Sequence, residues 1–127
     1  DWREQWCERG LEILNGLGLE ARSDVASDPF FGRTGKMLAR SQRSQALKFE
    51  ILVQIASPEP TAVASFNCHR EHFASLYGLT CADGGPAYTA CVGFGLERIT
   101  LAMGKQQGDD HGSWPSEIRA QLWDAAA

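Results

Sequence analysis

The sequence has no long hydrophobic run, because none of its apolar stretches approaches the roughly 18 residues that a membrane-spanning helix needs. No signal peptide is visible at its start. Positive charge is not in excess either, since the formal net charge at pH 7 is -4. These absences argue against a membrane protein and against one drawn to nucleic acid by its overall field. We therefore expect a cytoplasmic protein.

Cysteine is sparse, and its spacing is irregular. The four cysteines, Cys7, Cys68, Cys81 and Cys91, form no CxxC motif. A disulfide framework is typical of short secreted chains, so reduced thiols are the expectation here. Cys68 stands next to His69, but neighbouring side chains point in different directions. We therefore do not predict a metal site from Cys68, His69 and the nearby His72.

The chain has 127 residues, of which 43% are hydrophobic and 22% charged. This length and composition suit one globular domain or part of one. Internal repeats and low-complexity runs are absent from the sequence. The chain starts at Asp1 rather than Met and enters directly on a helix-like pattern, so we expect a fragment or processed piece that lacks an N-terminal portion.

Hydrophobic periodicity and turn residues divide the chain into short elements. Helices are predicted at 2–17, 37–45, 96–106 and 115–123. Strands are predicted at 19–26, 46–56, 61–67 and 88–94. A loop is predicted at 27–36, and residues 69–79 suit either a helical turn or a bent extended segment. Because the strands do not alternate with helices as in βαβ units, the fold class predicted is α+β, with an antiparallel sheet and flanking helices.

The stretch VGFGLERITLA, residues 92–102, carries the strongest chemical signal. Gly93 and Gly95 begin a Gly-x-Gly pattern, but the place of the third glycine of a dinucleotide fingerprint is taken by Arg98. A large cation at that place would prevent the close packing of helix on strand. The pattern therefore argues against a dinucleotide-binding turn.

Strand alternation suggests another use for these glycines. Residues 91, 93 and 95 share one side of a strand, while Val92 and Phe94 are predicted to face the core. Gly93 and Gly95 would leave a bare floor on which a flat ring can lie. Arg98, one turn into the following helix, would reach back over that floor.

This arrangement resembles motif 3 of the class II aminoacyl-tRNA synthetases, at about residues 87–106. In that motif strand glycines form the floor of the adenine pocket, and the arginine packs against ATP. The family pattern has three alternating glycines, whereas here Cys91 takes the first position. The resemblance implies that its thiol projects into the aminoacyl pocket beside the nucleotide.

Longer stretches resemble one group of synthetase homologues. DPFFGRTGKMLARSQRSQALKFEILVQI, SFNCHREHF and YTACVGFGLERITLAM together resemble the amino acid:[carrier protein] ligases, which are related to seryl-tRNA synthetases but lack a tRNA-binding domain. The resemblance implies that residues 1–127 are the C-terminal part of a class II synthetase-like catalytic domain. Motif 1, which builds a homodimer in the full-length protein, and motif 2, with its ATP-binding arginine, would lie before this region.

The same resemblance assigns roles to single residues. Cys91 matches a cysteine that ligates a zinc ion holding the amino group of the amino acid; the family's other two ligands, a cysteine and a glutamate, would lie outside this chain. Arg98 takes a catalytic, nucleotide-binding role together with the glycine floor. Glu50 is either an ATP or Mg²⁺ contact or a solvated strand residue. Ser65 and Asn67, on one side of a strand, are either nucleotide ligands or ordinary exposed polar residues.

A basic cluster lies further towards the N-terminus and contains Arg33, Lys36, Arg40 and Arg43. The last three are spaced i, i+4, i+7 and could form one cationic helix face. The alternatives are a solvated charged helix and, as the resemblance implies, a helix that docks an acidic carrier protein. Arginine suits the phosphate of the carrier's phosphopantetheine arm.

The function expected is therefore ATP-dependent activation of a small amino acid, Gly or Ala, to aminoacyl-AMP. The aminoacyl group would then pass to the phosphopantetheine thiol of the carrier protein, with Zn²⁺ and Mg²⁺ as cofactors. We expect the fragment alone to be inactive. One alternative is a fragment of a zinc-dependent seryl-tRNA synthetase, although no tRNA-binding arm is visible and tRNA is not expected as a partner. The other is a non-catalytic synthetase-like binding module.

Overall fold

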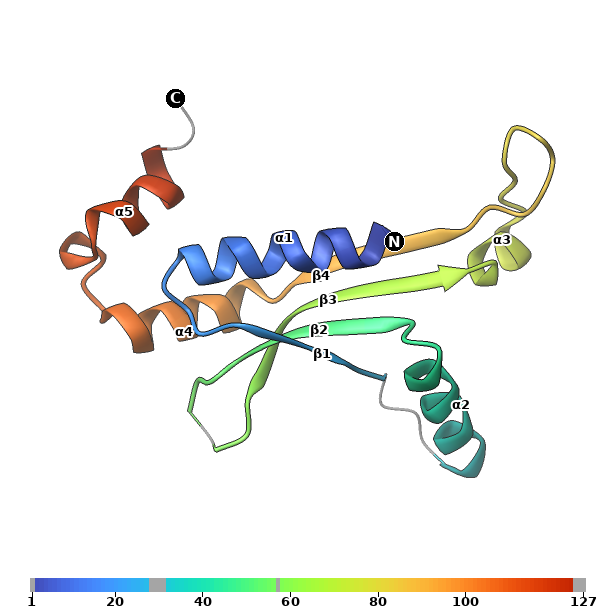
Figure 1. Cartoon of the computed structure of the whole chain (residues 1–127), viewed down its shortest axis with the longest axis horizontal. Helices are drawn as coiled ribbons and strands as arrows, with labels where there is room; N and C mark the ends of the chain where they lie inside the picture. The colour runs from blue at the N-terminus through green and yellow to red at the C-terminus, as the bar shows by residue number, and fades with distance from the viewer. Residues whose placement is uncertain (1, 28–31, 57, 125–127) are drawn as a thin grey trace.

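A computed structural model describes residues 2–27, 32–56 and 58–124. Its helices are α1 (Trp2–Gly16), α2 (Gly32–Ser44), α3 (His72–Tyr77), α4 (Leu96–Gln107) and α5 (Ser116–Arg119), the last continuing as a π-helix over Ala120–Asp124. The strands are β1 (Arg22–Val25), β2 (Lys48–Val53), β3 (Thr61–Arg70) and β4 (Thr89–Phe94). All neighbours are antiparallel in the order β1-β2-β3-β4, with helices around the sheet (Figure 1).

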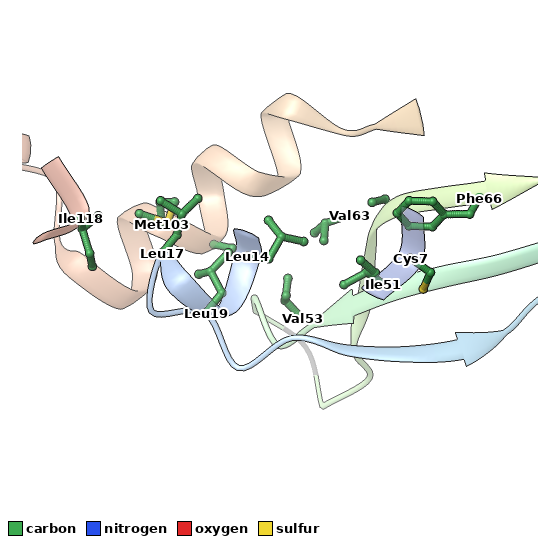
Figure 2. Packing of buried hydrophobic residues seen from close by; sticks show 12 residues of the cluster. Cys7, Leu14, Leu17, Leu19, Ile51, Val53, Val63, Phe66, Met103 and Ile118 are labelled. Atoms are coloured by element: carbon green, nitrogen blue, oxygen red, sulfur yellow. The ribbon is translucent and has the colours of Figure 1, made fainter. Parts of the chain in front are cut away.

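The hydrophobic core lies between α1 and one face of the sheet. Its fully buried side chains are Leu14, Ile51, Val63 and Phe66 (Figure 2). Ile51 and Val53 lie two residues apart on β2, and both are buried in the core cluster. Burial of each large side chain contributes about 1.5–3 kcal/mol.

Gly10 lets α1 approach the sheet closely. A Cβ atom at this position would lie 2.8 Å from Cζ of Phe66 and 2.9 Å from Cδ1 of Ile51. Both neighbours are fully buried, so neither has free space into which it can move. The small residue therefore sets the distance at which α1 covers the sheet.

Three sequence expectations differ from the structure. α2 begins at Gly32, inside the stretch predicted to be a loop, and β3 continues to Arg70 instead of ending at Asn67. The third difference concerns Phe94, which was predicted to face the core. Its side chain is 44% exposed, although its ring meets that of Phe66 edge-on. The physical reason is that β4 is an edge strand while α1 packs mainly over β1, β2 and β3. Val92, on the same side, does pack against the core.

Within the ranges that the structure describes, no helix has both the length and the apolar content needed to cross a bilayer.

Candidate functional site

The sheet face opposite α1 carries the residues that the sequence singled out. The antiparallel register aligns two rows across β2, β3 and β4: Glu50–Ser65–Gly93 and Lys48–Asn67–Cys91. Residues directly opposite one another in paired strands share a face, so the members of each row lie side by side on one face of the sheet. The register therefore brings together residues that are far apart in the sequence.

A hollow of about 370 Å³ lies over the end of this face nearest α4. Its lining residues are Lys48, Glu50, Ala62, Val63, Ala64, Ser65, Gly93, Phe94, Gly95 and Arg98. This volume falls in the range of roughly 300–1,000 Å³ that small-molecule sites occupy. A larger hollow of about 750 Å³ lies beside the start of α1 and contains none of the predicted site residues, so its size alone does not identify it as the functional site.

Gly93 on β4 and Gly95, the residue between β4 and α4, form the floor of the hollow. A Cβ atom at Gly93 would lie 3.4 Å from Oγ of Ser65, and one at Gly95 would lie 3.4 Å from Cδ of Arg98. Neither contact is a clash, so a methyl group fits at both positions. A larger side chain would extend into the space of the hollow.

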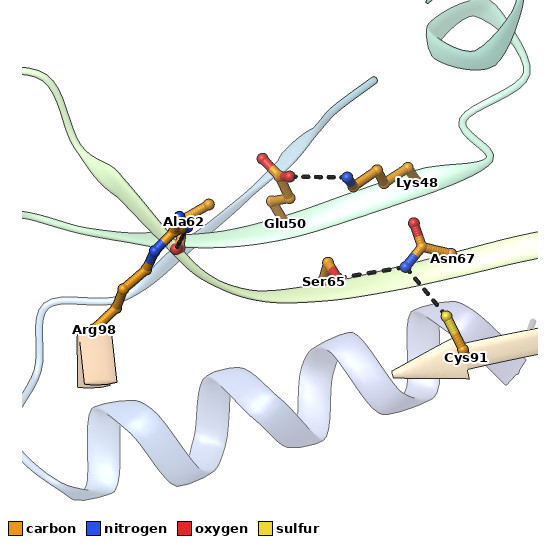
Figure 3. Close-up of polar contacts among 7 residues, drawn as sticks. All are labelled: Lys48, Glu50, Ala62, Ser65, Asn67, Cys91 and Arg98. Atoms are coloured by element: carbon orange, nitrogen blue, oxygen red, sulfur yellow. Dashed lines mark hydrogen bonds and ion pairs between the residues drawn. The ribbon is translucent and has the colours of Figure 1, made fainter. Parts of the chain in front are cut away.

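Arg98 lies at one end of the floor, in the first turn of α4. Its guanidinium donates a hydrogen bond from Nη1 to the carbonyl oxygen of Ala62 at 2.7 Å (Figure 3). The bond ties the start of α4 to β3 and holds the cation beside the hollow. The predicted position of Arg98 next to the two glycines agrees with this geometry.

The middle of the face carries a lysine and a carboxylate. Nζ of Lys48 lies 3.2 Å from Oε1 of Glu50, and both side chains line the hollow. The sequence had singled out Glu50 alone. Strand alternation places Lys48 on the same side as Glu50, so the signal for it was present.

Cys91 lies at the other end of the face from Arg98 (Figure 3). Nδ2 of Asn67 lies 3.4 Å from its Sγ and also 3.4 Å from Oγ of Ser65. The Cys91 side chain is exposed, unlike that of Cys7, where burial raises the pKa of the thiol. Cys91 is therefore the more accessible of these two sulfurs for a ligand.

Cys91 fits a zinc ion as one ligand, because its exposed sulfur faces the same way as the hollow and thiolates are normal zinc ligands. Among the residues that the structure describes, no group of three His, Cys, Asp or Glu side chains could hold a metal ion. A site built on Cys91 would therefore need ligands beyond this described part of the chain.

His69 lies beside Cys91, and no role was expected for it from the sequence. Its Nε2 is 3.5 Å from Sγ of Cys91. Every second residue of β3 faces the same side, and these include Ser65, Asn67 and His69. Because the predicted strand ended at residue 67, His69 was not recognised as part of this face.

The basic helix leads into β2, whose first residue, Lys48, belongs to the same row as Cys91. The side chains of Lys36, Arg40 and Arg43 on α2 are exposed. Two large apolar side chains, Met37 and Leu38, are exposed between them. The Arg33 side chain, the fourth member of the predicted cluster, lies outside the described part of the structure.

Comparison with known proteins finds similarity to ligases. No family model matches it. It is 51% identical to amino acid–[acyl-carrier-protein] ligase 1 of Bradyrhizobium diazoefficiens over 120 residues, which cover 94% of this chain and 37% of the relative. Ligase 2 of the same organism is 50% identical over 122 residues, covering 95% of this chain and 36% of the relative. The chain thus spans little more than a third of these curated relatives.

More distant matches belong to serine–tRNA ligases. The type-2 serine–tRNA ligase of Methanococcus aeolicus is 29% identical over 125 residues, covering 94% of this chain and 24% of the relative. A crystal structure of M. kandleri SerRS in complex with A. aeolicus tRNASec matches 98% of this chain and 25% of that chain, with a TM-score of 0.72 and 26% identity. These matches confirm the predicted fold class, an antiparallel sheet with flanking helices as in a class II synthetase core.

Proposed function

We propose that this chain, which resembles amino acid–[acyl-carrier-protein] ligases over nearly all of its length, forms the nucleotide- and amine-binding part of such a ligase. The whole enzyme would use ATP to activate a small amino acid as aminoacyl-AMP. It would then transfer the aminoacyl group to the phosphopantetheine thiol of a carrier protein.

The observation that carries the proposal is the order of chemical groups along one sheet face. Arg98 and the glycine floor occupy one end of the face, and Glu50 and Ser65 lie in the middle. Cys91 lies at the other end (Figure 3). The basic helix α2 precedes β2, and β2 begins at this end with Lys48. An adenine ring would lie on the floor, and the amine of the amino acid would lie towards Cys91. The bond-forming atoms would then meet between them.

Activation is an in-line displacement at phosphorus. A carboxylate oxygen of the amino acid attacks the α-phosphorus of ATP, the bond to the β-phosphate oxygen breaks, and pyrophosphate leaves. Arg98 would stabilise negative charge on the nucleotide, while Ser65 and Asn67 offer hydrogen bonds along the same face. Such a reaction depends chiefly on positioning and on fixed charges near the developing charge.

Two ions would complete the site. Glu50, whose carboxylate lines the hollow, would help to hold Mg²⁺ with the ATP phosphates. Cys91 would be one zinc ligand, with the others supplied from beyond the described residues. When bound, zinc would select substrates that have a free α-amine, since an open coordination position accepts a neutral nitrogen.

The size of the amino acid would be limited around Cys91. Asn67 and His69 both have nitrogen atoms within 3.5 Å of its sulfur, so they occupy the side of the sulfur that faces β3. This crowding favours Gly or Ala over larger substrates. The exposed cations of α2 would attract an acidic carrier protein to the same end of the face.

Serine activation followed by transfer to tRNA is a second candidate, because type-2 serine–tRNA ligases match the same region. Identity to them is 29%, against 51% to the carrier-protein ligase, so we favour the carrier protein as acceptor.

Amino-acid-dependent exchange of pyrophosphate into ATP by the full-length protein tests the proposal. We expect exchange with Gly or Ala, and transfer of labelled amino acid to a carrier protein that bears the phosphopantetheine arm. The same carrier without the arm is the control and should accept no label. Exchange with serine and transfer to tRNA would support the second candidate, whereas no exchange with any amino acid would indicate a non-catalytic module.

A further inference from the structure

We infer that His69 is a positioning residue that holds the sulfur of Cys91 in the orientation needed to bind a metal ion. The inference rests on the proposed function, in which Cys91 is a zinc ligand, and adds a residue to which the sequence patterns assigned no role. Its basis is the set of contacts that hold the imidazole ring between β3 and β4.

The first contact is with the sulfur itself, at 3.5 Å from Nε2 of His69. The other ring nitrogen, Nδ1, lies 3.1 Å from Oγ1 of Thr89. A sulfur bound to metal accepts hydrogen bonds and does not donate them, so Nε2 must carry the proton. The Thr89 hydroxyl can then donate to Nδ1, because a hydroxyl is both donor and acceptor. These two bonds select one tautomer and one ring orientation.

A third contact fixes the plane of the ring. His69 meets Phe73 edge-on, with the ring centroids 4.7 Å apart and an interplanar angle of 77°. Phe73 belongs to α3, so a separate element supports the imidazole from outside the sheet. The ring is therefore held by a strand, a helix and the sulfur together.

The backbone of β3 is irregular where it presents this histidine. The register with β4 shifts between Cys68 and Arg70, and Arg70 has a φ of 50°, in the left-handed region that residues other than glycine rarely adopt. Such irregularities re-aim side chains and are concentrated near functional sites. Here the irregularity spans His69, which reaches across to Cys91 on the next strand.

Asn67 supplies a second nitrogen to the same sulfur, at 3.4 Å from its Nδ2. Asn67 and His69 both belong to β3, so both approach Cys91 from the side of that strand. Because both donors lie on the β3 side of the sulfur, its remaining lone pairs point away from β3 and are available to a metal ion. Groups that hydrogen-bond a metal ligand in this way usually change metal affinity by about 10–100-fold when they are removed.

The test measures zinc affinity of the full-length protein by competition with a chelator of known affinity. We expect His69→Ala to weaken zinc binding by about 10–100-fold. His69→Gln should restore most of the affinity, because its side-chain amide can donate near the position of Nε2. Thr89→Val should weaken binding by a smaller factor, since it releases the ring without removing it. His111→Ala is the matched control, because His111 packs against Trp123, and it should bind zinc like the wild type.

A second readout uses cobalt in place of zinc. The sulfur-to-cobalt charge-transfer band should shift in His69→Ala and remain present, because the sulfur stays bound. It should disappear in Cys91→Ser. Circular dichroism of each variant checks that the fold is intact.

The possible failures can be told apart. Zinc retained by Cys91→Ser with wild-type affinity would overturn the metal-ligand role of Cys91 in the proposed function. Loss of zinc in Cys91→Ser together with wild-type affinity in His69→Ala would overturn the positioning role alone. Equal loss in His69→Ala and His69→Gln would also overturn it, because glutamine replaces a hydrogen-bond donor but not a metal-bound imidazole.

Discussion

At the scale of single residues, Gly93 on β4 and Gly95, which directly follows that strand, keep the floor of the hollow free of side chains. They lie on the sheet face that holds Cys91, and they leave open the space above the strand next to Arg98. Their value lies in the absence of side-chain atoms and does not depend on an unusual backbone, because neither glycine has a positive φ.

Gly95→Val should abolish nucleotide binding while the protein stays folded. The Cβ atom would make ordinary contacts, 3.4 Å from Cδ of Arg98 and 3.5 Å from the carbonyl oxygen of Val63, but the two further methyl groups would occupy the hollow. We expect pyrophosphate exchange by the full-length protein to fall to background.

Ala90→Val is the matched control for Gly95→Val, because Ala90 lies on the face of β4 opposite to that of Gly93. It should exchange pyrophosphate at the wild-type rate. Normal exchange in a folded Gly95→Val protein would show that adenine does not lie on this floor.

At the scale of elements, packing distance and surface charge decide what each helix does. α1 lies close to the sheet because Gly10 faces two buried side chains. α2, in contrast, exposes its cations and two apolar residues, of which Met37 is 73% exposed. One helix therefore packs on the core, and the other leaves its cations and two apolar side chains exposed.

Gly10→Ala should destabilise the protein although alanine favours helices. The gain in helix propensity is about 1 kcal/mol, whereas overpacking a tight core costs about 1–3 kcal/mol. The Cβ atom of an alanine at this position would lie only 2.8 Å from Phe66 and 2.9 Å from Ile51, so the site is tightly packed. We expect a lower midpoint in urea denaturation.

The matched change for Gly10 is Gly104→Ala in α4, where the nearest atom to a new Cβ is 3.7 Å away, at Oδ1 of Asp109. This variant should be as stable as the wild type or more stable. If both variants gained stability, close packing at Gly10 would be refuted.

Reversing charge on α2 should separate the two half-reactions. The double variant Arg40→Glu with Arg43→Glu should weaken aminoacylation of the carrier protein while pyrophosphate exchange remains near wild type, because neither residue lines the hollow proposed to bind the nucleotide. Added salt should reduce the difference between variant and wild type, since exposed charges are screened beyond roughly 8 Å at physiological ionic strength.

Arg9→Glu on α1, an exposed position away from α2, provides the control for general charge effects. It should leave both half-reactions near wild type. An equal loss of both half-reactions in the α2 variant would point to a folding defect and count against a docking role.

At the scale of the whole molecule, this chain holds only some of the residues that the proposed site would need. It spans 37% and 36% of the two carrier-protein ligases it matches, and within its described residues no cluster of three metal-binding side chains occurs. The chain can therefore supply the glycine floor, Arg98 and one sulfur ligand. Its described residues do not supply the further ligands that a metal centre needs.

The 127-residue chain purified alone should contain no stoichiometric zinc and should not exchange pyrophosphate. The full-length protein should contain zinc, because ligands from beyond these residues complete the site. Atomic emission on both proteins measures metal content, and circular dichroism verifies that the shorter one is folded. Stoichiometric zinc in the 127-residue chain would show that its own residues suffice.

The sequence by itself determined the class of fold, the resemblance to carrier-protein ligases and the faces of the strands. These features depend on local patterns. Alternation along β4 places Cys91, Gly93 and Gly95 on one side whatever the rest of the chain does, and the following Arg98 lies one turn into a helix. The comparisons confirm the resemblance and the fold class. The individual site roles stay predictions.

Only the tertiary structure decided which residues meet across the strands. The register that aligns Glu50 with Ser65, and Ser65 with Gly93, depends on pairing between distant segments, which a local pattern does not specify. The same holds for His69: its contact with Cys91 requires β3 to continue past Asn67 and to shift its register before Arg70. Phe94 differs from its predicted burial for a related reason, because the area that α1 covers is set by packing between elements and not by alternation along one strand.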